Sequence, residues 1–180
     1  MKAIKTELKD VYLIQEEYFH DERGFFVEAF NLKKFKDLTG FDGNFVQDNH
    51  SRSRMNVVRG LHYQIQHPQG KLVRCISGVV TDVLVDLRKS SPTFGKSLMV
   101  QLPSSNNIQL WVPPGFAHGF YVLSQYAEVM YKTTDYYYPE YERTLLWNDP
   151  DLNLTWNSHK PIISPKDALG KTFEECDKYE

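Results

Sequence analysis

Turn-forming residues interrupt this 180-residue chain about every eight to twelve residues, and the runs between them are rich in β-branched and other apolar side chains. That spacing predicts an antiparallel sandwich or barrel, because alternating strands and helices would need longer intervals. We therefore predict an all-β fold with a few short helices. Strands are expected at Leu72–Ile76, Val79–Leu87, Ser97–Leu102, Ile108–Val112, Phe120–Leu123 and Glu128–Thr133.

Three local signals refine this prediction. Asn31 suits a helix N-cap and Gly40 suits the end of the same helix. Ser77–Gly78 separates two apolar runs and predicts a tight hairpin turn. Ser164–Asp167 predicts a second helix start, in which Asp167 has the spacing of a capping box and thus an ordinary structural role.

Composition excludes several classes of protein. Disorder is excluded because 41% of the residues are hydrophobic and the net charge is only −2. No apolar run approaches the ~18 residues of a membrane helix, and Lys5 and Glu7 interrupt the start where a signal peptide would lie. Nothing in the charge balance indicates nucleic-acid binding. We expect one domain over residues 1–180, in the cytoplasm, with Cys75 and Cys176 as free thiols.

The string Pro113–Gly119 contains P-x-G-x-x-H, half of the pattern of cupins, which are small double-sheet jelly rolls. Metal-binding cupins pair this histidine with an H-x-H motif on an earlier strand. Here the candidate strand offers His62, but Gln64 stands where the second histidine belongs. Two imidazoles make a poor set of metal ligands, so we expect no metal. His62 and His118 could equally be hydrogen-bonded core histidines.

Basic residues cluster on or beside two expected strands: Arg59, His62, Lys71 and Arg74 lie within sixteen residues. If Arg59 and Lys71 both point into one barrel mouth, their burial is costly unless they hold an anionic or polar ligand. A solvated strand face is the alternative.

Tyrosines form a second cluster, and such a cluster can stack on a base or sugar and donate a proton. A half-buried strand with aromatic side chains is the structural alternative for each of them. The cluster contains Tyr131, Tyr136, Tyr137, Tyr138 and Tyr141.

Nine strings in register from about residue 4 to residue 168 resemble the dTDP-4-dehydrorhamnose 3,5-epimerase family. Together they cover nearly the whole chain, so the resemblance is specific. The strings are Asp21–Phe26, Phe45–His50, Arg59–Gln64, Gln69–Arg74, Asp86–Lys89, Ser91–Gly95, Pro114–Phe120, Leu146–Asp149 and Lys166–Ala168.

This resemblance implies a cupin-type double-sheet jelly roll that needs no cofactor and works as a homodimer. The implied reaction inverts carbons 3 and 5 of dTDP-4-dehydro-6-deoxy-glucose, giving dTDP-4-dehydro-rhamnose for nucleotide-sugar biosynthesis. Two alternatives remain: a relative that epimerises one carbon or moves the keto group, and a non-catalytic sugar-nucleotide binding protein.

The resemblance also implies roles for individual residues. His62 matches the proton acceptor, Tyr131 the proton donor, and Asp167 the carboxylate that pairs with the histidine. Tyr137 falls where the family places the ring that stacks on thymine, and Lys71 is suited to stabilise an enolate oxygen. Substrate-binding positions are matched by Arg23, Glu28, Gln47, Asp48, Asn49, Arg59, Lys71, His118, Glu142 and Lys166.

Inversion next to a ketone explains why a base and an acid are both needed. A single base would return its proton to the face from which it came, so two groups must flank the sugar ring. An imidazole titrates near neutral pH and suits the base. We further expect Asp21–Glu28 to extend a sheet across the dimer and to reach the neighbouring site.

Overall fold

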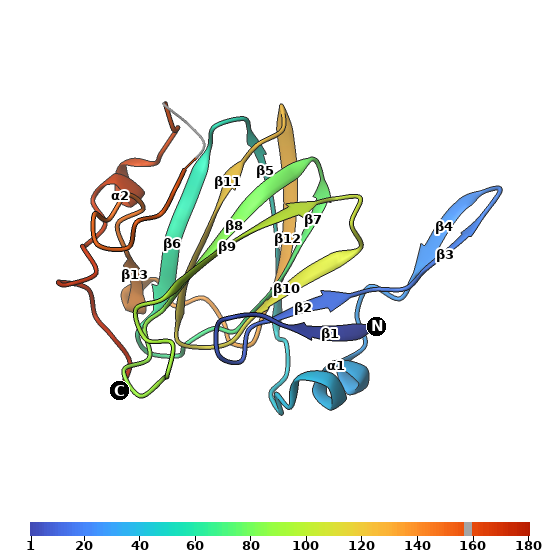
Figure 1. Cartoon of the computed structure of the whole chain (residues 1–180), viewed down its shortest axis with the longest axis horizontal. Coiled ribbons are helices and arrows are strands. Elements are labelled where there is room, and N and C mark those ends of the chain that lie inside the picture. The colour runs from blue at the N-terminus through green and yellow to red at the C-terminus, as the bar shows by residue number, and fades with distance from the viewer. Residues whose placement is uncertain (157–159) are drawn as a thin grey trace.

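Two antiparallel sheets and one hairpin make up the computed structural model, which describes residues 1–156 and 160–180 (Figure 1). The two facing sheets confirm the all-β jelly roll. The six-stranded sheet has the order β1 (Lys2–Lys5), β2 (Tyr12–Gln15), β10 (Ile108–Val112), β7 (Lys71–Ser77), β12 (Tyr126–Thr133), β5 (Gln47–Arg54). The five-stranded sheet has the order β13 (Glu142–Thr144), β6 (Val58–Gln64), β11 (Phe116–Val122), β8 (Val79–Asp86), β9 (Ser97–Pro103). The remaining elements are the hairpin β3 (Tyr18–Asp21) and β4 (Gly24–Val27), the helices α1 (Leu32–Thr39) and α2 (Pro165–Ala168), and the 3₁₀ turn η1 (Pro139–Tyr141).

The chain crosses between the two sheets at almost every step from β5 to β13, and only β8 and β9 stay in one sheet. The hairpin expected at Ser77–Gly78 is therefore wrong: β7 and β8 belong to different sheets, and the dipeptide forms the corner between them. Gly78 has φ +80°, and a Cβ there would lie 2.2 Å from the Tyr126 carbonyl oxygen. Glycine allows this tight corner, but the same residue type also suits a hairpin, so local sequence did not separate the two.

All six predicted strands are confirmed in position, and they correspond to β7 to β12. The strands β1 to β5 and β13 were not predicted. Strand β11 begins at Phe116, so His118 lies within a strand rather than in the preceding loop. Strand β5 was not predicted, because its sequence QDNHSRSR has no apolar alternation. It nevertheless pairs with β12 along its whole length.

Helix α1 confirms the predicted caps. The Asn31 side chain accepts a hydrogen bond from the Lys34 N–H, and Gly40 ends the helix with φ +73°. The helix buries Phe35, whose ring packs edge-on against Trp111 with centroids 5.0 Å apart. Helix α1 thereby covers the outer face of the six-stranded sheet at β2, β7 and β10.

The interior between the sheets is apolar over most of its length, and Val73, Leu84, Leu110 and Phe120 are fully or almost fully buried there. A second apolar cluster contains Cys176 and lies where the C-terminal chain runs beside the five-stranded sheet. Both cysteines are buried free thiols. In the described part of the chain, no helix is long and apolar enough to cross a membrane.

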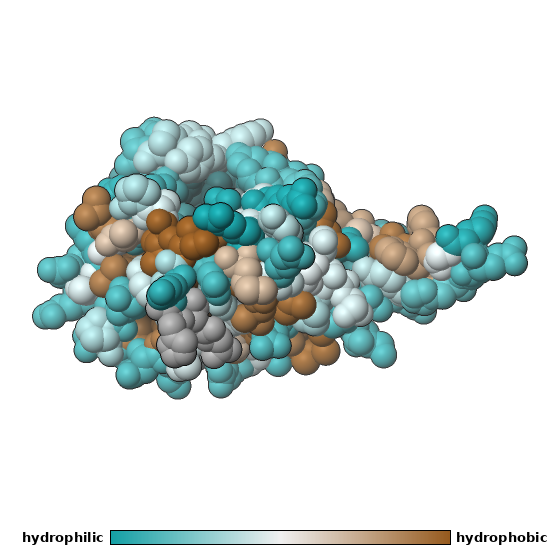
Figure 2. All heavy atoms as spheres, turned by 90° about the horizontal axis from the view of Figure 1, so that it is seen from above, coloured by the Kyte–Doolittle hydropathy of each residue, from teal (hydrophilic) through white to brown (hydrophobic). Residues whose placement is uncertain are grey.

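The hairpin β3–β4 extends away from the body of the molecule as an arm (Figures 1 and 2). Phe25 and Phe26 are 61% and 70% exposed on it. Two exposed aromatic rings on a projecting hairpin are typical of a surface that packs against another molecule.

A close approach of two glycines fixes β6 against β11. Gly60 has φ +115°, and a Cβ there would lie 2.7 Å from the Gly119 Cα. The close approach adjoins the paired positions of His62 and His118. It thus holds the part of the five-stranded sheet that carries both histidines.

We expect Gly60→Ala to lower the free energy of unfolding by about 3 kcal/mol or more, because it adds a clash to backbone strain. Gly24→Ala is the matched control, since Gly24 has φ +127° but no atom within 4 Å of the added Cβ. It should lose only about 1 kcal/mol. Urea unfolding of both variants measures the difference, and equal losses would show that the close approach adds nothing.

Candidate active site

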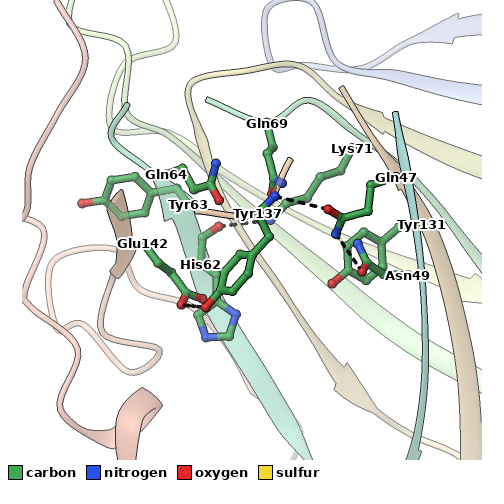
Figure 3. A pocket seen from close by; sticks show the side chains of 10 residues that line it. All are labelled: Gln47, Asn49, His62, Tyr63, Gln64, Gln69, Lys71, Tyr131, Tyr137 and Glu142. Carbon is green, nitrogen blue, oxygen red and sulfur yellow. Dashed lines mark hydrogen bonds between the residues drawn. The ribbon is translucent and has the colours of Figure 1, made fainter. Parts of the chain in front are cut away.

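A pocket of about 280 Å³ opens between the two sheets, and seven of the fourteen site residues expected from sequence line it (Figure 3). Strands from both sheets supply its walls. The lining residues are Gln47, Asn49, His62, Tyr63, Gln64, Gln69, Lys71, Tyr131, Tyr137 and Glu142.

His62, on β6, is held by a buried carboxylate. Its Nε2 lies 2.6 Å from Asp167 Oδ1, and Asp167 is only 3% exposed. Burial alone would raise the pKa of Asp167, but hydrogen bonds from His62, the Gly60 N–H and Ser164 hold it below its usual value. The carboxylate is therefore ionised and accepts the Nε2 proton, which leaves the lone pair of His62 on Nδ1.

The C-terminal turn that carries Asp167 combines a structural and a site role. The predicted cap is confirmed in its first half, because the Ser164 hydroxyl accepts a hydrogen bond from the Asp167 N–H. The purely structural role is wrong: the Asp167 carboxylate also bonds His62 and the Gly60 N–H, which are far from this helix in the chain. Its position in the helix places this carboxylate behind His62.

Tyr131 and Lys71 enter the pocket from the opposite sheet, on β12 and β7. Burial raises the pKa of the Tyr131 phenol, Arg59 lowers it in part and Glu142 raises it further. The phenol therefore stays protonated at neutral pH and can donate a proton. His62 and Tyr131 thus face one cavity from two different walls.

Lys71 is a buried cation beside a second histidine–carboxylate pair. Burial lowers its pKa to about 8, although Asp82 and Glu142 oppose that effect. Asp82 Oδ1 lies 2.8 Å from His118 Nε2, and both residues are buried. Burial lowers the pKa of His118 despite this carboxylate. His118 is therefore set behind the pocket rather than in its lining.

Glu142 connects two further expected residues. It accepts a hydrogen bond of 2.7 Å from the Tyr137 hydroxyl and forms an ion pair with Lys166. Burial would raise the pKa of Glu142, but Lys166 and Tyr137 hold it below its usual value. The ionised carboxylate in turn raises the pKa of Tyr137 to about 12. Half of the Tyr137 surface remains exposed at the pocket.

The other expected binding residues divide into two groups. Gln47 and Asn49 line the pocket. Arg59 donates a hydrogen bond of 2.9 Å to the Ser53 hydroxyl, and its positive charge lowers the pKa of Tyr131. The remaining three lie outside it. Asp48 points to the outer face and pairs with Lys132, Glu28 pairs with Lys34, and Arg23 pairs with Asp21 on the arm.

The cluster of basic residues and the cluster of tyrosines noted in the sequence are only partly brought together at the pocket. Arg74 faces away from the pocket, where it donates to the Tyr18 hydroxyl. Of the tyrosines, Tyr131 and Tyr137 line the pocket, whereas Tyr138 and Tyr141 pack beside His67.

The residues at the cupin metal position do not fit a metal. Among the described residues only two imidazoles, His62 and His118, are present there, and the Gln64 amide in place of a further histidine is bonded to backbone groups of neighbouring loops. Within residues 1–156 and 160–180, no three His, Cys, Asp or Glu side chains converge as metal ligands would.

Sequence reasoning missed three polar residues at the site: Gln64, Gln69 and Asp82. Gln64 was noted only for the histidine it replaces. Asp82 carried a detectable signal, since it is a carboxylate in the middle of the largely apolar strand VVTDVLVD. Gln69 lies in a loop and carried none.

Burial of Lys71 predicts a dependence of stability on pH. Because its folded pKa is about 8, the unfolded chain binds more protons between pH 8 and 10.5, and stability contributed by this site rises with pH in that window. Lys71→Met should remove the rise. Urea unfolding from pH 7 to 10 tests this, and parallel curves for the two proteins would contradict a lowered pKa.

Comparison with known proteins matches the chain to one family over nearly its full length. The model of the family described as dTDP-4-dehydrorhamnose 3,5-epimerase matches residues 5–175. A Pseudomonas aeruginosa protein of that name is 52% identical over 178 residues, covering 98% of both chains.

Solved structures agree in fold. The crystal structure of dTDP-6-deoxy-D-glucose-3,5-epimerase from Legionella pneumophila with dTDP-4-keto-L-rhamnose superposes with a TM-score of 0.95. It is 47% identical, covering 98% of this chain and 94% of its own. A 3′-monoepimerase from Streptomyces bikiniensis with dTDP-quinovose has a TM-score of 0.87, 28% identity and coverages of 97% and 88%. The near-complete family match, with the facing His62 and Tyr131, leads to one conclusion: the chain belongs to the dTDP-4-dehydrorhamnose 3,5-epimerase family.

Proposed function

We propose that the protein inverts carbons 3 and 5 of dTDP-4-dehydro-6-deoxy-glucose, giving dTDP-4-dehydro-rhamnose for nucleotide-sugar biosynthesis. One observation carries the proposal: His62 and Tyr131 reach the same pocket from opposite sheets, with Asp167 behind His62. A sugar ring between them has a base on one face and an acid on the other.

His62 removes the proton in this mechanism. The hydrogens on carbons 3 and 5 are acidic because each carbon adjoins the 4-keto group, and removal of either one leaves an enolate. The ionised Asp167 fixes the Nε2–H tautomer, so Nδ1 is the basic atom. The same carboxylate stabilises the imidazolium that forms, as in the hydrolase triads.

Tyr131 returns a proton to the other face. Its phenol is protonated in the resting protein because burial raises its pKa. Lys71 supplies a buried positive charge for the enolate oxygen, and a preorganised group of this kind is worth ~3–4 kcal/mol in the transition state. The cycle moves only protons, so we propose that it needs no cofactor.

The nucleotide part of the substrate is held at the pocket rim. Tyr137 offers an exposed ring on which thymine can stack. Arg59 and Lys166 carry positive charge near the pocket for the diphosphate, with Gln47 and Asn49 as polar contacts. His118 keeps the substrate-binding role in this proposal, and it acts from behind the lining together with Asp82.

Arg23, Glu28 and Asp48 bind substrate in this proposal only through a homodimer. Within one chain, Arg23 lies on the projecting arm and is 84% exposed in its side chain. A two-fold interface buries Phe25 and Phe26 and brings the arm to the neighbouring site. We further propose one domain over residues 1–180, a cytoplasmic location, and no nucleic-acid or membrane partner.

The alternative of a single-carbon epimerase is favoured by one observation, the fold shared with the Streptomyces 3′-monoepimerase. Such an enzyme also needs one base and one acid, so geometry alone does not separate the two. A non-catalytic binding protein would have no use for the buried Asp167–His62 pair.

Incubation with the 4-keto sugar nucleotide in D₂O tests the mechanism. We expect deuterium at carbons 3 and 5 with the native protein, and deuterium at one carbon only for a single-carbon epimerase. His62→Ala should abolish exchange at both, and Asp167→Asn should slow it. Tyr131→Phe should still exchange but invert roughly 10²–10⁴-fold more slowly, since only the acid is lost. Near-native inversion by Tyr131→Phe, measured by NMR, would remove Tyr131 from the mechanism.

Complementation tests the homodimer. Arg23→Ala and His62→Ala should each be impaired, because each lacks one part of every site. Co-expressed subunits form mixed dimers in which one site has both parts, so we expect roughly a quarter of native activity to return. A fully active monomer in sedimentation, or no recovery in the mixed sample, would contradict an arm that serves the partner's site.

A further inference from the structure

Gln64 occupies the position at which metal-binding cupins carry their second histidine, and its amide is fully engaged. Its Nε2 donates to the His67 carbonyl at 2.8 Å and to the Tyr136 carbonyl at 3.2 Å. Its Oε1 accepts from the Tyr138 N–H at 2.8 Å. The side chain is 3% exposed. Gln64 therefore forms hydrogen bonds to the backbone on both sides of Tyr137, at Tyr136 and Tyr138.

Two further glutamines hold the same segment, residues 135–138. Gln69 donates to the Asp135 carbonyl at 2.9 Å, and Gln47 accepts from the Tyr137 N–H at 3.2 Å. Figure 3 shows Gln47, Gln64 and Gln69 arranged around Tyr137. The segment itself belongs to no helix or strand. Side-chain amides from three other segments thus take over the bonding that regular structure would provide.

Position 64 requires an amide for this task. The contacts demand two donated hydrogens and one accepting oxygen on a single short side chain, which glutamine supplies. A histidine there has no oxygen for the Tyr138 N–H together with two donors for the carbonyls. An ionised glutamate has no donor at all. The replacement that removes a metal ligand therefore also creates a support for the Tyr137 segment.

We propose that Gln64 is a positioning residue that sets nucleotide affinity by holding the Tyr137 ring in place for stacking. This inference rests on the proposed function, in which Tyr137 receives thymine. Without Gln64, water replaces the amide at the flanking backbone groups and the ring samples several orientations. Nucleotide binding then has to order that segment, and the lost conformational entropy weakens the affinity. In the native protein the segment is already ordered by folding. Proton transfer at His62 and Tyr131 is left intact.

Calorimetric titration with dTDP and with inorganic pyrophosphate tests this role. We expect Gln64→Leu to weaken dTDP binding roughly tenfold, since buried hydrogen bonds that order the ring are lost. Pyrophosphate lacks a base and should bind as tightly as before. In turnover, KM for the sugar nucleotide should rise while kcat stays near native. Gln101→Leu is the matched control, because Gln101 is exposed on β9 away from the pocket.

A double-mutant cycle with Tyr137→Ala completes the test. If Gln64 acts through Tyr137, the double variant binds dTDP no more weakly than Tyr137→Ala alone. Additive losses, equal weakening of pyrophosphate, or unchanged dTDP binding by Gln64→Leu would overturn the proposal. Should Gln64→Leu fail to fold, Gln69→Leu must show the same pattern with a smaller effect, and native affinity in it would also overturn the proposal. Failure of the native protein to bind dTDP would instead refute the proposed function.

Discussion

A buried carboxylate that stays ionised is the constraint around which this molecule is arranged. Asp167 is almost completely removed from solvent, and an unpaired charge in that position would be very costly. His62, the Gly60 N–H and Ser164 together make it tolerable. Each of these partners has to be placed to within a fraction of an ångström. The close approach at Gly60, the C-terminal turn and the tautomer of the histidine are therefore parts of one arrangement.

Alternation of the chain between two sheets explains how so few residues build a site with two faces. Strands that follow one another in sequence lie in opposite walls, so β6 and β7 place His62 and Lys71 across from each other although only nine residues separate them. The acid on β12 then joins Lys71 on the same wall by direct pairing of the two strands. In a fold built of hairpins, neighbours in sequence would share one wall, and this opposition would need longer connections.

Much of this was readable from the sequence, and the failures have physical causes. Runs rich in β-branched and other apolar residues located β7, β8 and β12, because many of their side chains are buried in the core. Strand β5 was not predicted, since its partly buried side chains are polar, with Gln47 and Asn49 lining the pocket, and its other side chains are exposed. The sheet change at Gly78 could not be predicted, because a glycine corner and a hairpin turn have the same local sequence.

The site residues could likewise be predicted where local sequence determines them, and not where their partners are far away in the chain. Residue types and the resemblance pointed to His62 and Tyr131, whose pocket positions follow from strands. Spacing alone assigned Asp167 to a helix cap, because its true partner is far away in the chain. Gln64 was visible only as a missing ligand, since its three contacts are to loop backbone that no pattern places beside it.

The distance along the chain between paired elements also bears on how the protein is made. Strand β2 pairs with β10, and His62 meets Asp167 across 105 residues. Folds with so many distant pairings assemble slowly, on the order of milliseconds to seconds. A growing chain that has reached Thr144 already contains every strand of both sheets, yet it still lacks the turn that pairs with its histidine. The order of synthesis therefore puts the scaffold first and leaves the charge that completes it to a segment that emerges later.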